Sequence, residues 1–358
     1  MIKLIIIVLT LIYIFFIKKK ILLDSYQNFK KVTVQLTNAT FKPNIIKSGS
    51  VHGLYSKYSN VLNKIYPLIH INSRGSFENI NFLLKNNKSI ILSQSDIALD
   101  IYLNKTRVST NQDKIRLIAN IFYENPLLVI NKLSNIHSWT DLKGKNIIIG
   151  GNGSGSRYIA LKLLKLANIK LSDVNILDIN PYNLNLINKY MKNRELDAIF
   201  YMIDNPNIII RKLSNKHFID IIGTKGINLD LIRTRFPTWK QSKIDISYYN
   251  ITGNVSTINT FTSPVYLLTN KYQEDKVIYK LLETILSNRL FIINNLKHDL
   301  NKKSLEKISP SQIIENRNSI PFHPGVISFL RNIGLISNNN NKKCYLFAGS
   351  GKCNEDIL

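Results

Sequence analysis

The chain has 358 residues, and its 48 lysine and arginine residues outnumber 23 aspartate and glutamate residues, so its formal net charge is +25. Hydrophobic residues make up 44% of the chain, which excludes disorder as its main state, and two cysteines exclude a disulfide-rich scaffold or a zinc-ribbon cluster. The length fits two domains of about 150 residues each, or one large α/β unit.

The basic excess raises the question of nucleic-acid binding. Lysines and arginines are spread along the whole chain, and the longest runs are Lys18–Lys20 and Lys342–Lys343. A nucleic-acid site usually concentrates its basic residues on one face, with aromatic residues between them. Asparagine, isoleucine and lysine are abundant together, and all three have AT-rich codons, so base composition explains the charge. We therefore expect no nucleic-acid partner.

The amino-terminal segment 1–23 contains an apolar run at residues 4–17. A helix of that length spans about 21 Å, short of the ~30 Å hydrocarbon core of a membrane. The segment is therefore interpreted as either a signal peptide or an uncleaved signal anchor. No small-residue cleavage site comes after it, which argues against cleavage. Lys18–Lys20 favour a cytoplasmic position for the chain after the apolar run, whereas Lys3 and the terminal amine favour export. Residues 24–40 are predicted to be a connector.

From residue 41, strand-like apolar runs alternate with segments of helical period. Residues 45–50, 68–76 and 145–156 each read as a strand with a turn, and they lead into helices predicted at 52–65, 77–86 and 157–168. In the first helix, Leu54, Tyr58, Val61, Leu62 and Ile65 share one face. This alternation predicts an α/β fold with largely parallel sheets.

Two apolar strands indicate how the chain is divided. Pro126 with residues 127–130 marks a passage into a second lobe, and residues 257–270 mark a passage back. We predict that 41–126 form the first part of lobe 1, that 127–262 form lobe 2, and that 263–336 return to lobe 1. Helices are expected around 274–297 and 311–317 in the returning part.

The tail at 337–358 is rich in asparagine and is predicted to be flexible. It contains the only cysteines, Cys344 and Cys353, and a hairpin-like loop can bridge the eight residues between them. An exported chain would allow a disulfide there, whereas a cytosolic chain would not. A disulfide and a pair of free thiols both remain open.

Three strands end in turns of glycine and serine, each leading into an amphipathic helix. The turns are residues 49–55, 74–79 and 151–156. Glycine allows close approach of a ligand to the backbone, and the free N–H groups of a helix start attract anions. In open α/β sheets, ligands bind beyond the carboxyl ends of strands. The three turns together predict a site for a carboxylate or a phosphate.

Two other interpretations of the turns fail on spacing. Residues 151–156 lack the Gly-Lys-Ser/Thr ending of a nucleotide triphosphate loop, and their glycine spacing differs from that of a dinucleotide fingerprint. Asp96, which comes after Gln94 and Ser95 at the end of a strand, has three possible roles: binding a ligand amine, bracing the turn or capping the next helix.

Catalytic signals are missing from the sequence. No two histidines stand at metal-ligand spacing, and there is neither an HExxH motif nor a credible nucleophile elbow. His323, beside Pro324, is interpreted as a structural hydrogen-bonding residue in a turn. We predict that the protein is not an enzyme, with no catalytic residue, metal or cofactor.

In chain order, the motifs resemble the TAXI family of solute receptors, which serve tripartite ATP-independent periplasmic (TRAP) transporters. They are Gly49-Ser50 with Gly53 and Tyr55, Gly75-Ser76 with Asn79, Gln94-Ser95-Asp96, Asp141-Leu142-Lys143-Gly144-Lys145, Gly153-Ser154-Gly155-Ser156, Asp197-Ala198-Ile199-Phe200 and His323-Pro324-Gly325. The resemblance covers about residues 45–335.

This resemblance implies a two-lobed type II periplasmic-binding-protein fold with a ligand cleft between the lobes. Such a receptor closes around a small organic acid, an amino acid or a dicarboxylate, and delivers it to a TRAP membrane permease. It also implies a periplasmic location, with anchoring by the amino-terminal segment if that segment is uncleaved. The alternative is a membrane-tethered periplasmic sensor with no transport role.

The three turns and the family resemblance together predict one ligand site. Its predicted residues are Gly49, Ser50, Tyr55, Arg74, Gly75, Ser76, Asn79, Gln94, Ser95, Asp96, Gly153, Ser154, Gly155 and Ser156. The chain departs from the family pattern at Arg74 and Arg157, which would either bind a dianion or lie solvated on the cleft rim. Asp204 and Asn205 replace the usual glycines before Pro206, which leaves the ligand and the coupling to a permease open.

Overall fold

The computed structural model describes residues 44–51, 53–103, 111–251, 256–296, 309–310, 313 and 320–336. The predicted amino-terminal hydrophobic helix and its connector lie outside these residues, as do Cys344, Cys353 and most of the helix expected at 311–317. Over the described part of the chain, we find no helix with the length and apolar character needed to span a bilayer.

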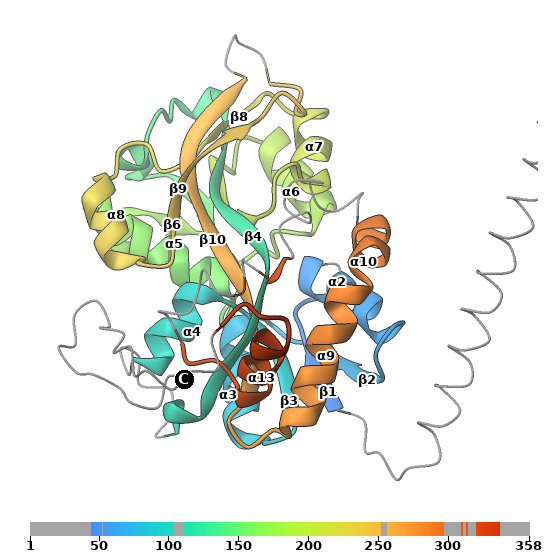
Figure 1. Ribbon diagram of the computed structural model, residues 1–358. Helices are drawn as coiled ribbons and strands as arrows, with labels where there is room; N and C mark the ends of the chain where they lie inside the picture. Colours follow the sequence, from blue (N-terminus) through green and yellow to red (C-terminus); the bar gives the residue numbers. More distant parts are fainter. Residues whose placement is uncertain are drawn as a thin grey trace, which may run out of the picture. The chain divides into compact units, whose positions relative to one another are not determined.

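Helices and strands alternate along the described chain (Figure 1). The strands are β1 (Asn44–Lys47), β2 (Leu68–Ile71), β3 (Ser89–Gln94), β4 (Ile115–Asn131), β5 (Asn146–Ile148), β6 (Asn175–Ile176), β7 (Ala198–Ile203), β8 (Ile219–Ile222), β9 (Lys240–Asp245) and β10 (Thr257–Asn270). The helices are α2 (Leu54–Asn63), α3 (Ser76–Lys85), α4 (Ser95–Tyr102), α5 (Gly155–Leu166), α6 (Leu184–Lys192), α7 (Ile208–Ser214), α8 (Leu229–Arg235), α9 (Asp275–Ser287), α10 (Arg289–Leu296) and α13 (Pro324–Asn332).

Two long strands, β4 and β10, run through both halves of the described chain (Figure 1). The strand order is β2-β1-β3-β10-β4-β7-β5-β6, with β8 paired to β4 and β9 paired to β10. β4 pairs with β10 up to Glu124 and with β7 from Asn125 onward. β10 pairs with β9 as far as Thr262 and with β4 from Ser263. Each long strand therefore leaves one sheet and enters the other.

We call the part built on β1, β2 and β3 lobe 1, and the part built on β5 to β9 lobe 2. Lobe 1 also holds α2, α3, α4, α9, α10 and α13, and lobe 2 holds α5 to α8. β1 is parallel to β2 and β3, and β5 is parallel to β6 and β7. The shared strands are antiparallel to their neighbours. The predicted α/β fold with two lobes, of the type II periplasmic-binding-protein class, is confirmed.

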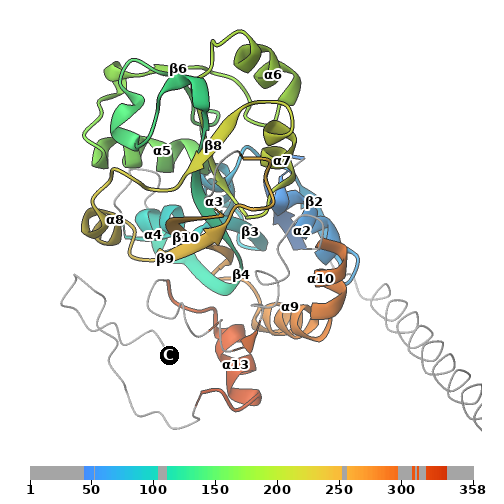
Figure 2. The same cartoon turned by 90° about the horizontal axis from the view of Figure 1, so that it is seen from above.

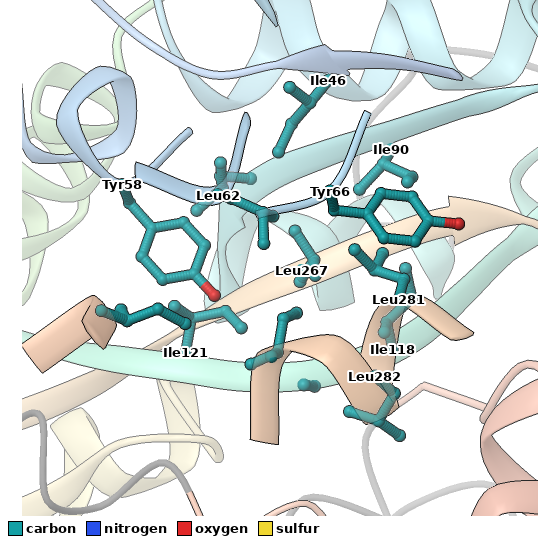
Figure 3. Packing of buried hydrophobic residues seen from close by; sticks show 14 of the residues in the cluster. Ile46, Tyr58, Leu62, Tyr66, Ile90, Ile118, Ile121, Leu267, Leu281 and Leu282 are labelled. Atoms are coloured by element: carbon teal, nitrogen blue, oxygen red, sulfur yellow. The ribbon is translucent and has the colours of Figure 1, made fainter. Parts of the chain in front are cut away.

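The predicted helices form because their apolar faces meet a sheet. The helix expected at 52–65 spans Leu54–Asn63, and those expected at 77–86 and 157–168 begin one or two residues earlier than predicted. In lobe 1, Tyr58 and Leu62 of α2 belong to the same buried cluster as Leu281 and Leu282 of α9 (Figure 3). Burying one such side chain contributes roughly 2 kcal/mol, so this shared cluster anchors the returning carboxyl-terminal segment to lobe 1.

His323 has the structural role that its turn predicts. Its Nδ1 accepts from the backbone N–H of Gly325 at 3.1 Å, which caps α13, and its Nε2 lies 3.1 Å from the carbonyl oxygen of Gln273. Because Nδ1 accepts, the ring is neutral with its proton on Nε2. Burial accordingly lowers the pKa of His323. The residue joins α13 to the loop that precedes α9.

Candidate functional site

A cavity of about 510 Å³ lies between the two lobes. Lobe 1 and the shared strands line it with Gly49, Ser50, Gly53, Leu54, Tyr55, Arg74, Gly75, Ser76, Gln94 and Glu124, and lobe 2 lines it with Gly150, Gly151, Asn152, Ser154, Gly155, Ser156, Asp178, Ile179, Asn180, Pro181, Tyr182 and Met202. The volume suits a small organic molecule.

The starts of three helices, α2, α3 and α5, meet at this cavity. Gly53 and Gly75 precede α2 and α3, and neither helix has a side chain that caps its first N–H groups. Ser154 precedes α5, and its Oγ accepts from the N–H of Arg157 at 3.2 Å. Because the first N–H groups of a helix have no partner within it, these three starts favour an anion.

The lobes come into contact at two glycines of the turns. A Cβ at Gly75 would lie 3.6 Å from Cα of Ser154 and 3.7 Å from the nitrogen of Gly155. The φ angle of Gly75 is 132°, a conformation that side chains rarely allow. A Cβ at Gly155 would lie 2.1 Å from Oε1 of Gln94. The predicted turns of lobes 1 and 2 are therefore in direct contact.

Most of the predicted site residues line the cavity. They are Gly49, Ser50, Tyr55, Arg74, Gly75, Ser76, Gln94, Ser154, Gly155 and Ser156. Gly153 does not line it, although its φ of 80° shapes the turn before α5. Asn79, Ser95 and Asp96 also lie outside the lining, and each is held by protein groups. A ligand-binding role remains a prediction for all of these residues.

Asn79 braces the strand ends of lobe 1. Its side chain is fully buried, and Nδ2 donates to the carbonyl oxygens of Ser48 and, at 2.8 Å, Leu92. These carbonyls belong to the ends of neighbouring strands, so Asn79 fixes the edge from which two of the turns start.

Ser95 and Asp96 contact lobe 2 instead of the cavity. Oδ2 of Asp96 accepts from Nε1 of Trp239 at 2.8 Å, and Oδ1 accepts from the N–H of Ile97 at 2.7 Å. Oγ of Ser95 lies 2.8 Å from Oγ1 of Thr238. Burial raises the pKa of Asp96 to about 7, although the bond from Trp239 lowers it. Of the three roles open to Asp96, bracing is the one that its contacts support.

The two arginines near the turns are already engaged. The side chain of Arg74 is 79% exposed, and its Nε donates to Oε2 of Glu78 at 3.0 Å. Arg157 donates to the carbonyl oxygen of Gly150 at 3.2 Å and is not part of the lining. Their contacts agree with a position on the rim rather than with two free cations aimed at a dianion.

Glu124 is a lining residue that sequence reasoning missed. It is 6% exposed, and its Oε2 accepts from Nε2 of Gln94 at 3.1 Å and from the hydroxyl of Tyr55 at 3.4 Å. Burial raises the pKa of Glu124 to about 8, and the charge of Asp204 adds to the rise. The only signal in the sequence is a carboxylate inside a strand whose other residues are mostly apolar.

A second polar contact between the lobes joins α4 to α5 and α8, which lie together in both views (Figure 1 and Figure 2). Asp100 accepts from Nζ of Lys162 at 2.6 Å, from the hydroxyl of Tyr158 at 2.7 Å and from NH2 of Arg235 at 2.8 Å. Its side chain is 5% exposed. Asp100 is therefore a buried carboxylate whose charge the other lobe balances.

The described residues bring together no group of histidine, cysteine, aspartate and glutamate that could hold a metal ion. The fold and the cavity define a two-lobed protein of the type II periplasmic-binding-protein class, with its cleft between the lobes. The chain belongs to the NMT1-like family, whose model matches residues 53–334.

Three solved structures are similar to this chain. One is MatC from Rhodopseudomonas palustris with bound malate, with a TM-score of 0.45, 10% identity, and coverage of 76% of this chain and 97% of that one. Another is a putative L-cystine ABC transporter from Listeria monocytogenes, with a TM-score of 0.43, 14% identity, and coverage of 74% of this chain and 98% of that one. The third is the alkanesulfonate-binding protein SsuA from Xanthomonas axonopodis pv. citri bound to MOPS, with a TM-score of 0.40, 12% identity, and coverage of 84% of this chain and 96% of that one.

Proposed function

We propose that the protein is an extracytoplasmic solute-binding receptor that captures a small organic acid between its lobes. The observation that carries the proposal is the meeting of three helix starts, two of them without a side-chain cap, at one cavity of about 510 Å³. N–H groups at these starts would hold the carboxylate, and serine hydroxyls would add hydrogen bonds.

Ligand delivery depends on closure of the lobes in this proposal. Lobe 1 would comprise 41–126 with 263–336, and lobe 2 would comprise 127–262. A ligand held by both lobes stabilises the closed state because it loses half of its contacts when they part. The closed receptor would then dock on a TRAP-type permease, as the resemblance to the TAXI family implies. The amino-terminal segment would direct export or keep the receptor at the membrane.

A thermal-shift screen of the purified full-length chain against small mono- and dicarboxylates tests the receptor function. A bound carboxylate at about 100 times its Kd should stabilise the fold by about 2.7 kcal/mol, which raises the melting temperature by several degrees. No shift with any carboxylate would overturn the proposal.

Substitution of two lining serines tests the location of the site. Ser76→Ala with Ser154→Ala should raise the Kd of a bound carboxylate about tenfold, because one hydroxyl from each lobe is lost. Titration calorimetry measures this change. The matched control is Ser172→Ala with Ser287→Ala, which removes one exposed hydroxyl from each lobe away from the cavity. Equal Kd values for the two double variants would place the ligand elsewhere.

A further inference from the structure

Glu124 stands in the cavity wall where β4 passes from one lobe to the other. It is the last residue of β4 that pairs with β10, and it lies opposite Ser263. Both of its hydrogen bonds come from neutral donors, Tyr55 and Gln94, and both reach the same oxygen, Oε2. Within the described chain, Oε1 accepts no hydrogen bond. One carboxylate oxygen is thus left for a partner at the cavity.

Among the described residues, no positive charge balances this carboxyl group. Among the described lysine, arginine and histidine residues, none forms an ion pair with Glu124. The charges that act on it are those of Asp96 and Asp204, which are also negative. A buried carboxylate with neutral donors and acidic neighbours is unstable in its charged form. A cation entering the cavity would remove that cost.

The helix starts in the cavity wall differ from the surroundings of Glu124 in their electrostatic character. There the cavity wall presents the uncapped amino ends of α2 and α3 and the start of α5, which attract negative charge. The cation in the described lining, Arg74, is paired with Glu78 and mostly exposed. One cavity therefore offers an anion-binding part and a buried acid that forms no ion pair with the described residues.

We propose that the ligand is a zwitterion with a protonated amine, as in an amino acid, and that Oε1 of Glu124 accepts from this amine. Tyr55 and Gln94 hold Oε2, which fixes the carboxylate for the ammonium group. This inference rests on the proposed function and selects amino acids over dicarboxylates within it. A dicarboxylate carries no cation that could stabilise the ionised form of Glu124.

Matched pairs of ligands test the inference on the full-length chain. L-glutamate is compared with glutarate, L-leucine with 4-methylpentanoate and L-serine with 3-hydroxypropionate, by thermal shift and then by calorimetry. We expect at least one amino acid to bind, with its partner lacking the amine at least ten times weaker. Equal or tighter binding of the partner would overturn the inference and leave the proposed receptor of carboxylates standing.

Glu124→Gln tests the residue itself. Glutamine keeps the shape and the bonds around Tyr55 and Gln94 but cannot balance an ammonium charge. The Kd of the amino acid should rise at least tenfold, while the Kd of its deaminated partner stays equal or falls. Glu283→Gln, on α9 and away from the cavity, is the matched control and should change neither Kd. Equal weakening of both ligands would assign Glu124 a structural role only.

Proton release on ligand binding is a measurement that would show no effect if Glu124 had only a structural role. The titratable groups that face Glu124 are Tyr55 from α2, Asp96 from α4, Asp204 after β7 and Tyr182 before α6. With a pKa of about 8, Glu124 carries its proton at pH 7, and an ammonium ion would expel it. Calorimetry at pH 7 in Bis-Tris and in Tris, two amine buffers with different ionisation enthalpies, should show release of a proton with the amino acid.

The pH dependence of ligand affinity provides a second test of Glu124. Affinity for the amino acid should rise with pH up to about 8 and then level off, because the ionised form of Glu124 binds the amine. Its deaminated partner should show no such rise, and neither should Glu124→Gln. If no small molecule of either kind stabilises the chain, the proposed function falls and this inference falls with it.

Discussion

Asp100 and Glu124 are two buried carboxylates between the lobes, and they differ in what balances their charge. Asp100 is 5% exposed in its side chain and faces two cations of lobe 2, Lys162 and Arg235. Glu124 is equally buried, and its protein partners are neutral. The charge of Asp100 is balanced within the protein. Glu124 lies at the cavity, and in our proposal the ammonium group of a ligand balances its charge.

Removal of the paired acid is the strongest way to test this contrast. Asp100→Ala should lower the free energy of unfolding by about 3 kcal/mol, because it leaves the charges of Lys162 and Arg235 facing each other without a counterion. Glu124→Gln should change it by less than about 0.5 kcal/mol. Urea unfolding of the full-length chain, without ligand, measures both.

An exposed ion pair provides the control for Asp100. The side chain of Asp230 is 84% exposed and pairs with Arg233 three residues later. Asp230→Ala should therefore cost only about 0.5 kcal/mol. A loss as large as that of Asp100→Ala would mean that burial does not set the difference.

The raised pKa of Asp96 makes the stability of the fold depend on pH. Burial raises the pKa of Asp96 to about 7, so the folded chain holds a proton that the unfolded chain has already lost above about pH 4. Its stabilising effect is present at low pH and is lost as pH rises through 7. Between pH 5 and 7 the unfolding free energy of the unsubstituted chain should fall by about 2 kcal/mol more than that of Asp96→Asn.

Trp239 gives a local readout for the same experiment because its Nε1 donates to Asp96 across the lobes. The other tryptophan, Trp139, donates to the carbonyl oxygen of Gly223 inside lobe 2. A chain with Trp139→Phe therefore reports Trp239 alone. Its fluorescence should change with pH in the window where Asp96 ionises, and a flat signal between pH 5 and 8 would contradict the assigned pKa.

The turns could be predicted well from the sequence because their signals are local. A glycine and a serine between an apolar strand and an amphipathic helix define both the backbone and its position at a sheet edge. Glu124 carries no such signal: its partners Tyr55 and Gln94 come from other elements, and only the folded sheet brings them to it. For the same reason Asp96 and Asn79 could not be separated from ligand contacts, since Trp239 and Leu92 are their actual partners.

A smaller effect on stability than at Asp100 or Asp96 is expected at Gly155, the first residue of α5. A methyl group at Gly155 would lie 2.1 Å from Oε1 and 2.7 Å from Cδ of Gln94, the side chain that donates to Glu124. Gly155→Ala should push Gln94 away and cost about 1 kcal/mol in unfolding free energy, because the displaced group is the flexible end of a side chain. Urea unfolding measures the loss.

Gly151→Ala is the matched control, since Gly151 also lines the cavity but no atom of the described residues lies within 4 Å of the added methyl group. Its unfolding free energy should stay within about 0.5 kcal/mol of that of the unsubstituted chain. Amino-acid binding should weaken in Gly155→Ala and stay nearly constant in Gly151→Ala, because only the former displaces a group that holds Glu124. Equal affinities in the two variants would show that the position of Gln94 has no influence on the ligand.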